Sequence, residues 1–457
     1  MTTAAAERVL DLAERALGRL GGGDAQATVV RERSLFSRFA RSRPTQATSI
    51  DDTTVMLLRI HDGHPGAAST NDHSDDGLRL AARRADAAAR AAAVAAGPGD
   101  HPGLPEPEPA RAHDGFDLAT AALDPAVAGA ALRAAFDACA EQGLEAFGLW
   151  TAGHVETAIA SSTGVRAHDA ATDAYLKVIA RDETGRTGWG VAASTAVRDL
   201  DAGAIARRAA AKVPRIEPVA VPPGDYSVVL EPDAVGELLQ VLGWLGFNGL
   251  AHAEGRGALT GRLGSRVAAP AINLSDSPRF ARTLPRAFDF EGVPKAPIPL
   301  IQDGVAHAVV HDRRSAARAG GGTRSTGHAL APGGSPHGPV PTNLVLIGGG
   351  AADERELAAP IERGLYVTRL WYVNPVHERS ALLTGTTRDG TFLIEDGRIT
   401  RPARDVRFTD SILRVLEGTQ ALTAQQRLVS EADFYGRRFA FGVVCPALRA
   451  AGLRVTA

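Results

Sequence analysis

Two stretches of the N-terminal half carry the same pattern, and this repeat constrains the fold more than any other feature of the sequence. Residues 54–70 and 174–195 each contain an apolar strand pattern and a glycine-containing turn, and each ends in Ala-Ala-Ser-Thr. Each is followed by an alanine- and arginine-rich segment that starts with acidic residues, which favour a helix start because they complement the helix dipole. The same offset relates a helical pattern at 4–20 to one at 127–142. We interpret the pattern as two copies of a helix–strands–helix unit. Chance similarity among alanine-rich helices is the alternative.

Proline- and glycine-rich segments divide the chain into three parts. They lie at 97–109 and 221–225, and proline at this density is incompatible with a helix interior or a central strand. We therefore predict a first α/β unit at 1–112, a second at 113–222 and a β-rich domain at 223–457. The expected fold class is α+β, with helices on a mostly antiparallel sheet in the duplicated units and a predominantly antiparallel β C-terminal domain.

Turn signals in the last part support that expectation. Three Asp-Gly pairs stand between alternating or β-branched runs, which is the strongest short signal for a hairpin. These pairs are Asp303-Gly304, Asp389-Gly390 and Asp396-Gly397.

The bulk composition excludes several classes of protein. A net charge of −2 over 457 residues gives no electrostatic basis for binding nucleic acid or an anionic membrane. The two cysteines, Cys139 and Cys445, exclude a disulfide framework and a CxxC metal site. The N-terminal segment is interrupted by charges, unlike a secretory signal, and no run is apolar enough to span a bilayer. We expect a cytoplasmic protein.

The histidine patterns give no convincing metal site. His307 and His311 stand four apart, which on a helix would place two imidazoles on one face. The residues between them favour a strand, however, and no acidic residue follows at a useful spacing. His252, His328 and His337 lie in glycine-rich loops, where a role as ligand is again disfavoured.

Aromatic residues cluster in the segment 364–376, although only 5% of the chain is aromatic. In a strand, Tyr366 and Tyr372 would share one face and Trp371 would lie on the other. A strand that is apolar on both faces is typical of a buried position in a sheet. An interface or peptide-binding role is the alternative.

Five motifs, in their order along the chain, resemble the TldD/PmbA family of metallopeptidases, and the resemblance covers nearly the whole sequence. Each motif alone is weak, but five in one order are specific. They are the strand pair at 54–70, Gly-Asp-Tyr-Ser-Val-Val-Leu-Glu-Pro at 224–232, Asp-Phe-Glu-Gly-Val at 289–293, Ser-Thr-Gly-His at 325–328 and Arg-Gly-Leu-Tyr-Val-Thr at 363–368.

The resemblance implies a helix after the strand at 224–230, and in catalytic subunits of the family this helix carries HExxxH, two zinc ligands and a general base. Alignment on residues 228–232 places Gln240 at the first histidine, Val241 at the glutamate and Leu245 at the second histidine. The closest equivalent of the cysteine that completes the zinc site is Phe441, and Cys445 is displaced from that position along the strand. Valine cannot abstract a proton and leucine has no lone pair for zinc, so we expect no metal and no catalytic residue in this chain.

The resemblance therefore implies a TldE/PmbA-type subunit that pairs with a TldD-like zinc subunit and is inactive alone. Zinc is expected in the partner, and the substrate is expected to be an unfolded or leader peptide, processed in peptide maturation or the degradation of small proteins. Candidate substrate or interface residues are Ser325, Thr326, His328, Tyr366, Trp371 and Tyr372.

Three alternatives stay open. The chain could be a TldE-like component of natural-product biosynthesis, or a binding protein or homodimer without peptidase activity. It could also be a self-sufficient enzyme that uses His252, Glu254, His307 or His328.

Overall fold

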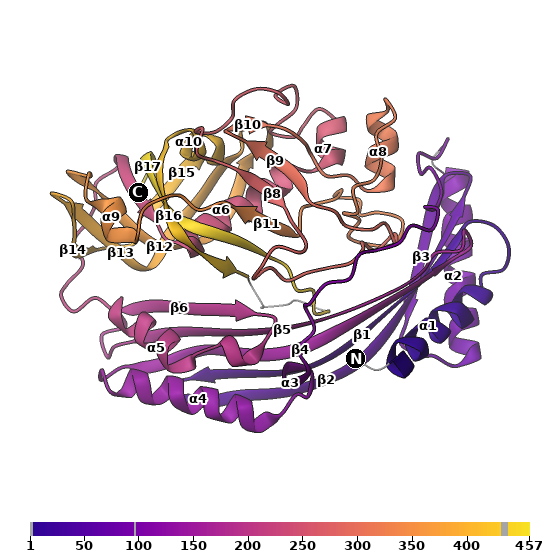
Figure 1. Cartoon of the computed structure of the whole chain (residues 1–457), viewed down its shortest axis with the longest axis horizontal. Helices are drawn as coiled ribbons and strands as arrows, with labels where there is room; N and C mark the ends of the chain where they lie inside the picture. The colour runs from indigo at the N-terminus through magenta and orange to yellow at the C-terminus, as the bar shows by residue number, and fades with distance from the viewer. Residues whose placement is uncertain (1–2, 96, 431–436) are drawn as a thin grey trace.

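The N-terminal half of the protein consists of two units that share the order helix, three strands, helix, and the second unit has the short α3 and η1 in addition (Figure 1). The computed structural model describes residues 3–95, 97–430 and 437–457. The repeat that the sequence predicts is present in the structure. The first unit comprises α1 (Thr3–Gly18), β1 (Ala25–Ala40), β2 (Arg43–His61), β3 (His64–Thr70) and α2 (Asp75–Ala95). The second comprises α3 (Leu118–Ala121), α4 (Pro125–Ala140), β4 (Glu145–Ser161), β5 (Arg166–Arg181), β6 (Thr187–Ser194), the 3-10 turn η1 (Val197–Asp199) and α5 (Ala202–Ala211).

The last helix of each unit packs directly on a glycine of the preceding strand. A Cβ atom on Gly66 of β3 would lie 2.1 Å from the backbone nitrogen of Ala89 in α2, and one on Gly190 of β6 would lie 2.2 Å from the carbonyl oxygen of Ile205 in α5. Any larger residue would push the helix away from the sheet. The same close contact recurs in both units, which favours a duplication over chance similarity.

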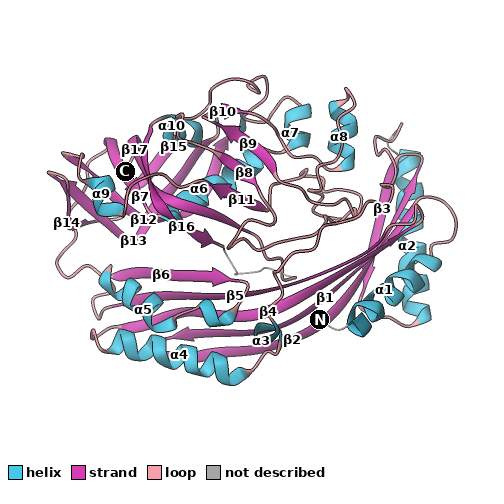
Figure 2. Cartoon of the chain, in the orientation of Figure 1, coloured by secondary structure: helices cyan, strands magenta, loops and turns pink. Residues whose placement is uncertain are grey.

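The two units form one continuous six-stranded sheet with the order β3-β2-β1-β4-β5-β6. β1 and β4 join the units as an antiparallel pair, with Ser34 opposite Gly153. Because side chains alternate along a strand, the neighbours Leu149 and Trp150 on β4 point to opposite faces. Trp150 packs with α4 and α5, whereas Leu149 packs with Trp189 on the other face. That other face lies toward the C-terminal domain (Figure 2).

The C-terminal domain is built around a mixed sheet in which antiparallel pairs predominate. The pairing of β7 with β17 closes the path β17-β15-β13-β12-β7 into a ring of strands, and β11, β8, β9 and β10 extend the sheet from β17. Only β11–β17 and β12–β7 are parallel among the described strand pairs. The strands are β7 (Gly224–Leu230), β8 (Leu274–Asp276), β9 (Ile298–Gln302), β10 (Val305–Ala306), β11 (Asn343–Leu346), β12 (Arg363–His377), β13 (Leu382–Glu395), β14 (Arg398–Ala403), β15 (Arg407–Ser411), β16 (Thr419–Val429) and β17 (Gly442–Val455).

Short helices cover this sheet, and one longer helix, α6, lies in the main core of the domain. The helices are α6 (Pro232–Leu245), α7 (Gly249–Ala253), α8 (Arg313–Ala319), α9 (Glu354–Ala358) and α10 (Ile412–Glu417), with the 3-10 turn η2 (Glu378–Ser380). The predicted fold class, α+β with mostly antiparallel sheet, is confirmed. No helix in the described ranges is long and apolar enough to cross a membrane.

Two predictions about the strands are wrong. Asp389-Gly390 is not a hairpin turn but lies within β13, where the register with β12 shifts. Both residues have positive φ, 55° and 130°, so the turn-like pair serves a β-bulge. The segment from His307 to His311 is not a strand either, because β10 ends at Ala306. Asp303-Gly304 and Asp396-Gly397 do form the predicted turns, between β9 and β10 and between β13 and β14.

The proline-rich linker between the two units is bound to the C-terminal domain. Both carboxylate oxygens of Asp100 accept hydrogen bonds from arginines of α8, with Arg314 Nε at 2.9 Å and Arg318 Nη2 at 2.5 Å. His101 Nε2 lies 3.6 Å from Glu291 Oε1, and both atoms are buried without a hydrogen bond to any described residue. The linker therefore connects the N-terminal sheet and the C-terminal domain through polar contacts.

Changing Glu291 to glutamine should weaken the dependence of stability on pH. Burial and the nearby Asp312 carboxylate raise the pKa of Glu291 to about 8, and burial lowers the pKa of His101 to about 4, so the pair is uncharged at neutral pH. Because the pKa of Glu291 is higher in the folded chain, its contribution to stability is complete below about pH 4.3 and is lost as the pH rises toward 8, at up to about 1.4 kcal/mol per pH unit.

Denaturation midpoints measured from slightly acidic to alkaline pH should therefore fall less steeply for Glu291→Gln than for the wild type. Glu108→Gln, at an exposed position of the same linker, is the control and should keep the wild-type slope. Parallel slopes for all three proteins would show that the Glu291 carboxyl does not change its protonation in this range.

Candidate functional site

The helix α6 is the element on which the resemblance places the zinc motif. It follows β7 directly, with Pro232 in its first turn, where the missing N–H of proline carries no penalty. Leu245 is only 6% exposed and belongs to the main core, and Val241 packs against the same core. Gln240 lines a cleft of about 930 Å³. Of the three positions at which a catalytic subunit has its two histidines and its glutamate, only that of Gln240 therefore faces a space that could hold a substrate.

The C-terminal segment that the resemblance pairs with α6 does lie beside it. A Cβ atom on Gly236 of α6 would lie 2.7 Å from the side chain of Val429 on β16, and Val429 pairs with Val443 on β17. Phe441 stands just before β17, and its carbonyl accepts a hydrogen bond from the Ser430 hydroxyl at 2.7 Å. The segment is thus held against α6 by backbone pairing and by close packing.

The side chains at this place do not fit a zinc ion. Cys445 is buried, its thiol contacts the carbonyl of Pro232 at 3.3 Å, and burial raises the pKa of this thiol well above its usual value. A thiol must lose its proton to bind zinc, and the hydrocarbon side chains of Val241 and Leu245 have no donor atom. Within the described ranges, no group of three or more His, Cys, Asp or Glu side chains is arranged to hold a metal.

A buried charge cluster occupies the N-terminal end of α6 and joins the two halves of the protein. Lys212, just after α5, lies 2.6 Å from Glu231, and Arg427 of β16 lies 3.2 Å from the same carboxylate. The Tyr366 hydroxyl also donates to Glu231. Although burial acts to raise it, the pKa of Glu231 is held below its usual value by Lys212 and Arg427. Tyr366 is therefore occupied by a structural contact inside the domain.

Trp371 and Tyr372 are exposed, so the prediction of a strand buried on both faces is wrong for the second half of β12. Trp371 is 43% and Tyr372 73% exposed, and Val376 further along is 55% exposed. The Trp371 ring also lines the 930 Å³ cleft and carries the Arg388 guanidinium 4.0 Å from its centre. The pair thus presents aromatic surface at the edge of the cleft.

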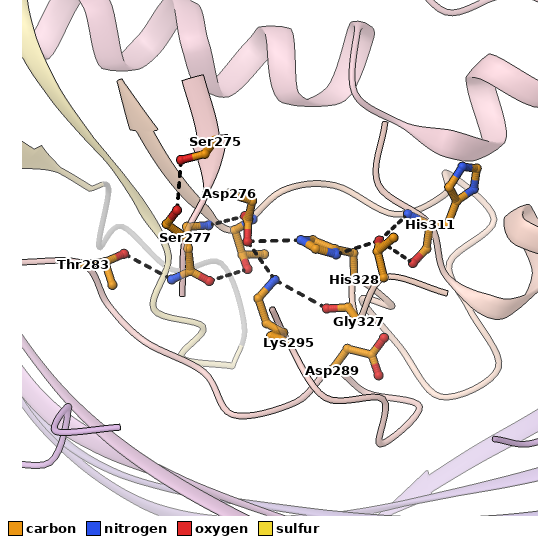
Figure 3. Close-up of polar contacts among 12 residues, drawn as sticks. Ser275, Asp276, Ser277, Thr283, Asp289, Lys295, His311, Gly327 and His328 are labelled. Carbon is orange, nitrogen blue, oxygen red and sulfur yellow. Dashed lines mark hydrogen bonds and ion pairs between the residues drawn. The ribbon is translucent and has the colours of Figure 1, made fainter. Parts of the chain in front are cut away.

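The Ser-Thr-Gly-His motif ends in a second buried network, shown in Figure 3. His328 Nε2 and Lys295 Nζ lie 3.2 Å and 3.3 Å from the same oxygen of Asp276. The other oxygen of Asp276 accepts the backbone N–H groups of Thr342 and Asn343, each at 2.8 Å. Although burial acts in the opposite direction, Lys295 and His328 hold the pKa of Asp276 well below its usual range.

Thr326, His328 and Asp276 are arranged in the order of a hydroxyl–imidazole–carboxylate triad, but the space for a substrate is missing. Thr326 Oγ1 lies 3.0 Å from His328 Nδ1, and the same oxygen bonds the backbone of His311. The cavity beside His328 has a volume of about 10 Å³, too small for a peptide group. Ser325 likewise donates to the carbonyl of His311. The geometry gives these residues a structural role inside the domain.

Within the described ranges the histidines considered as alternatives form no metal-binding group, although His252, on α7, and His328 lie near enough to act on the pKa of His311. His311 is buried beside Gly249, where a Cβ would lie 2.4 Å from its ring, and burial lowers its pKa to about 4. Glu254 forms ion pairs with Arg256 and Arg318. His307 is linked to β9 through its backbone.

Sequence reasoning missed Asp276, Lys295 and Glu231, although one signal pointed toward them. The chain has three lysines among 50 basic residues. Lys295 pairs with Asp276 and Lys212 with Glu231, while Lys177 lines the large cleft beside the Trp189 ring. In an arginine-rich chain, the rare lysines mark buried or cleft positions.

Comparison with known proteins agrees with the resemblance of the motifs. Profiles of the PmbA/TldA metallopeptidases match domain 1 at residues 25–89, the central domain at 117–215 and the C-terminal domain at 223–457. A metalloprotease of Methanothermobacter thermautotrophicus is 25% identical over 236 residues, which are 50% of this chain and 49% of that protein. A metalloprotease TldD homolog of Haemophilus influenzae is 26% identical over 237 residues, 50% of this chain and 48% of its own length. The chain spans about half the length of these curated relatives.

Solved structures show the same fold over the whole chain. TldE from Thermococcus kodakarensis has a TM-score of 0.83 at 19% identity, with 99% of both chains covered. A candidate modulator of DNA gyrase from Thermotoga maritima has a TM-score of 0.82 at 19% identity, with 100% of both chains covered. With the three domain profiles together covering most of its length, the chain belongs to the PmbA/TldD family of metallopeptidases.

Proposed function

We propose that this chain is a non-catalytic subunit of the TldE/PmbA type, which pairs with a TldD-like zinc subunit to cleave unfolded or leader peptides in the cytoplasm. The observation that carries the proposal is the state of α6. Where a catalytic subunit would have HExxxH, this helix has Gln240, Val241 and Leu245, and the last two pack into or against the hydrophobic core. Without a lone pair or a base at those positions, no metal-bound water can be activated there.

Because Leu245 is buried in the core and Val241 is partly buried against it, the absence of zinc ligands at these two positions is a stable feature of the fold. Exposing a core leucine would lose about 1.5–3 kcal/mol of burial energy. The binding of a substrate or metal would have to offset that loss of burial energy, and Val241 and Leu245 offer no ligand atom for such binding. The chain's own contribution to peptide cleavage would then be to enclose, together with the partner, a chamber that admits the peptide, and to position the partner.

An exposed apolar surface on β12 supports the existence of a partner. Trp371, Tyr372 and Val376 lie close together in sequence and are 43%, 73% and 55% exposed. Exposed aromatic side chains next to a cleft are typical anchor residues of protein interfaces. An obligate interface commonly buries more than about 2,000 Å², so these residues would be part of a larger contact.

Co-expression with a TldD-like zinc subunit should give a complex that stays together in size-exclusion chromatography at micromolar concentration. Tyr372→Asp together with Trp371→Asp should dissociate it, because two charges would be buried in an apolar contact. Val94→Asp changes an apolar residue of α2 that is even more exposed, at 90%, and should leave the complex intact. Separate elution of the wild-type chains would refute the proposal, and a dimer of this chain alone would favour the homodimer instead.

A further inference from the structure

A second cavity, of about 800 Å³, lies between the two halves of the protein. The edge strand β6 and α5 form its N-terminal side. The start of α6, the loop at 279–285 and β16 form its C-terminal side. Val191 and Asp233 line both this cavity and the 930 Å³ cleft, so the two spaces adjoin. A volume of this size is typical of a ligand site.

Two arginines in this cavity have buried donor atoms that find no partner in the part of the chain that the structure describes. Arg208 donates through Nη2 to the carbonyl of Val191 at 2.7 Å, but its Nε has no acceptor. Arg279 donates through Nη2 to the carbonyl of Lys295 at 3.1 Å, and its Nη1 has no acceptor. Among the described residues, neither guanidinium forms an ion pair. Buried donors are nearly always hydrogen-bonded in folded proteins. We therefore expect Arg208 Nε and Arg279 Nη1 to donate to an acceptor from outside the chain.

The nearby carboxylates do not supply that acceptor. Glu231 is already bonded to Lys212, Arg427 and Tyr366. Asp233 lies 3.6 Å from Arg427, burial raises its pKa, and among the described residues it forms no ion pair with Arg208 or Arg279.

At the rim, two exposed acids and one arginine line the cavity. Asp199 accepts a hydrogen bond from Ser194 at 2.6 Å, Arg282 donates to the Gln426 carbonyl at 2.9 Å, and Asp114 is exposed. The interior of the cavity therefore keeps an excess of positive charge.

The strand β6 provides a surface along which an extended chain could lie. It pairs with β5 and forms one edge of the six-stranded sheet, and Val191 to Thr195 line the cavity. Unpaired backbone groups on a strand edge bind an extended peptide by adding it as a further strand. A peptide held this way would bring a carboxylate toward Arg208.

We propose that this cavity binds a carboxylate of an extended peptide, held by Arg208 and Arg279 against the edge of β6. A guanidinium suits this ligand because its donors form a fork that matches both oxygens of a carboxylate. The peptide class rests on the proposed function, but the site itself belongs to this chain and needs no zinc subunit.

Titration calorimetry on the isolated full-length chain tests the proposal with three probes. They are acetyl-tetraalanine as the free acid, the same peptide as the C-terminal amide, and an amide in which one inner alanine is replaced by glutamate. We expect the free acid to bind at least about tenfold more tightly than the plain amide, as for loss of a hydrogen bond to a charged group. Tight binding of the glutamate peptide as well would extend the site to side-chain carboxylates.

Variants locate the binding on the two arginines. Arg208→Gln and Arg279→Gln should each weaken the free acid at least about tenfold, whereas Arg207→Gln, at an exposed position of the same helix, should not. Equal affinity for acid and plain amide, no measurable binding of any probe, or equal weakening by Arg207→Gln would each overturn the proposal. The comparison of acid with amide uses the wild-type chain, so it stands even if a variant fails to fold.

Failure of the two subunits to form a complex would leave this result unaffected, since the zinc partner is absent from the titration. The two proposals can therefore fail separately.

Discussion

Replacing Asp276 by alanine is expected to lower the free energy of unfolding by about 3–5 kcal/mol, because it leaves a buried charge without its partner. Lys295 Nζ would keep only the carbonyl of Gly327 at 3.4 Å among its described contacts. The backbone N–H groups of Thr342 and Asn343 would lose their acceptor as well. Chemical denaturation followed by fluorescence and circular dichroism measures the loss.

Two further variants of the chain show whether the loss of stability comes from the unpaired charge. Asp11→Ala, on the exposed side of α1, should change stability by less than about 0.5 kcal/mol. The double variant Asp276→Asn with Lys295→Met keeps an acceptor for the two backbone groups and removes both charges. It should be about 1–3 kcal/mol more stable than Asp276→Ala. If Asp276→Ala unfolds no more easily than Asp11→Ala, the network of Figure 3 does not stabilise the domain.

In the proposed complex, peptide cleavage should depend on the partner's glutamate and hardly at all on Gln240. Loss of a general base typically slows a reaction about 10²–10⁴-fold, so changing the glutamate of the partner's HExxxH motif should nearly abolish cleavage. Gln240→Ala removes an amide that no proton transfer requires. Its effect should be no more than about threefold, which is under 1 kcal/mol of barrier.

Both variants are measured on one unfolded peptide, with assembly of the complex verified by size-exclusion chromatography. A collapse of activity in Gln240→Ala, in a complex that still assembles, would mean that the residue in the cleft takes part in catalysis. Retention of activity after loss of the partner's glutamate would place the chemistry elsewhere.

Local patterns in the sequence predicted the elements of the N-terminal half because the determinants there are local. The acidic residues Asp75 and Asp76 start α2, and Asp201 caps α5 by accepting the N–H of Ala204. The two copies repeat the order helix, three strands, helix, although α2 has 21 residues and α5 only 10. The pairing of β1 with β4, which fuses the units into one sheet, is a long-range contact and could not be read from either copy alone.

In the C-terminal domain, local sequence patterns were ambiguous at the positions where tertiary contacts determine whether a segment is a turn, a bulge or a buried strand. Residues with positive φ suit a hairpin and a bulge equally, so Asp389-Gly390 could not be assigned from sequence. The apolar pattern around Trp371 suggested a buried strand, but β7 pairs with β12 only from Gly364 to Val367. Beyond that point one side of β12 lacks a neighbouring strand among the described residues, which exposes Trp371 and Tyr372.

The candidate site was predictable only in part. Alignment placed Gln240, Val241 and Leu245 on a helix after β7, and α6 lies there. The network of Asp276, Lys295 and His328 joins residues far apart in sequence. Nothing in their local patterns indicates that they meet, except the rarity of lysine.

The metal content of the purified chain tests the central claim most directly, since every step of the proposed function depends on the absence of a zinc site in α6. After dialysis, elemental analysis should find less than about 0.1 zinc per chain for this protein alone and about one per pair for the complex. About one tightly held zinc per isolated chain, lost on changing residues near α6, would contradict the account.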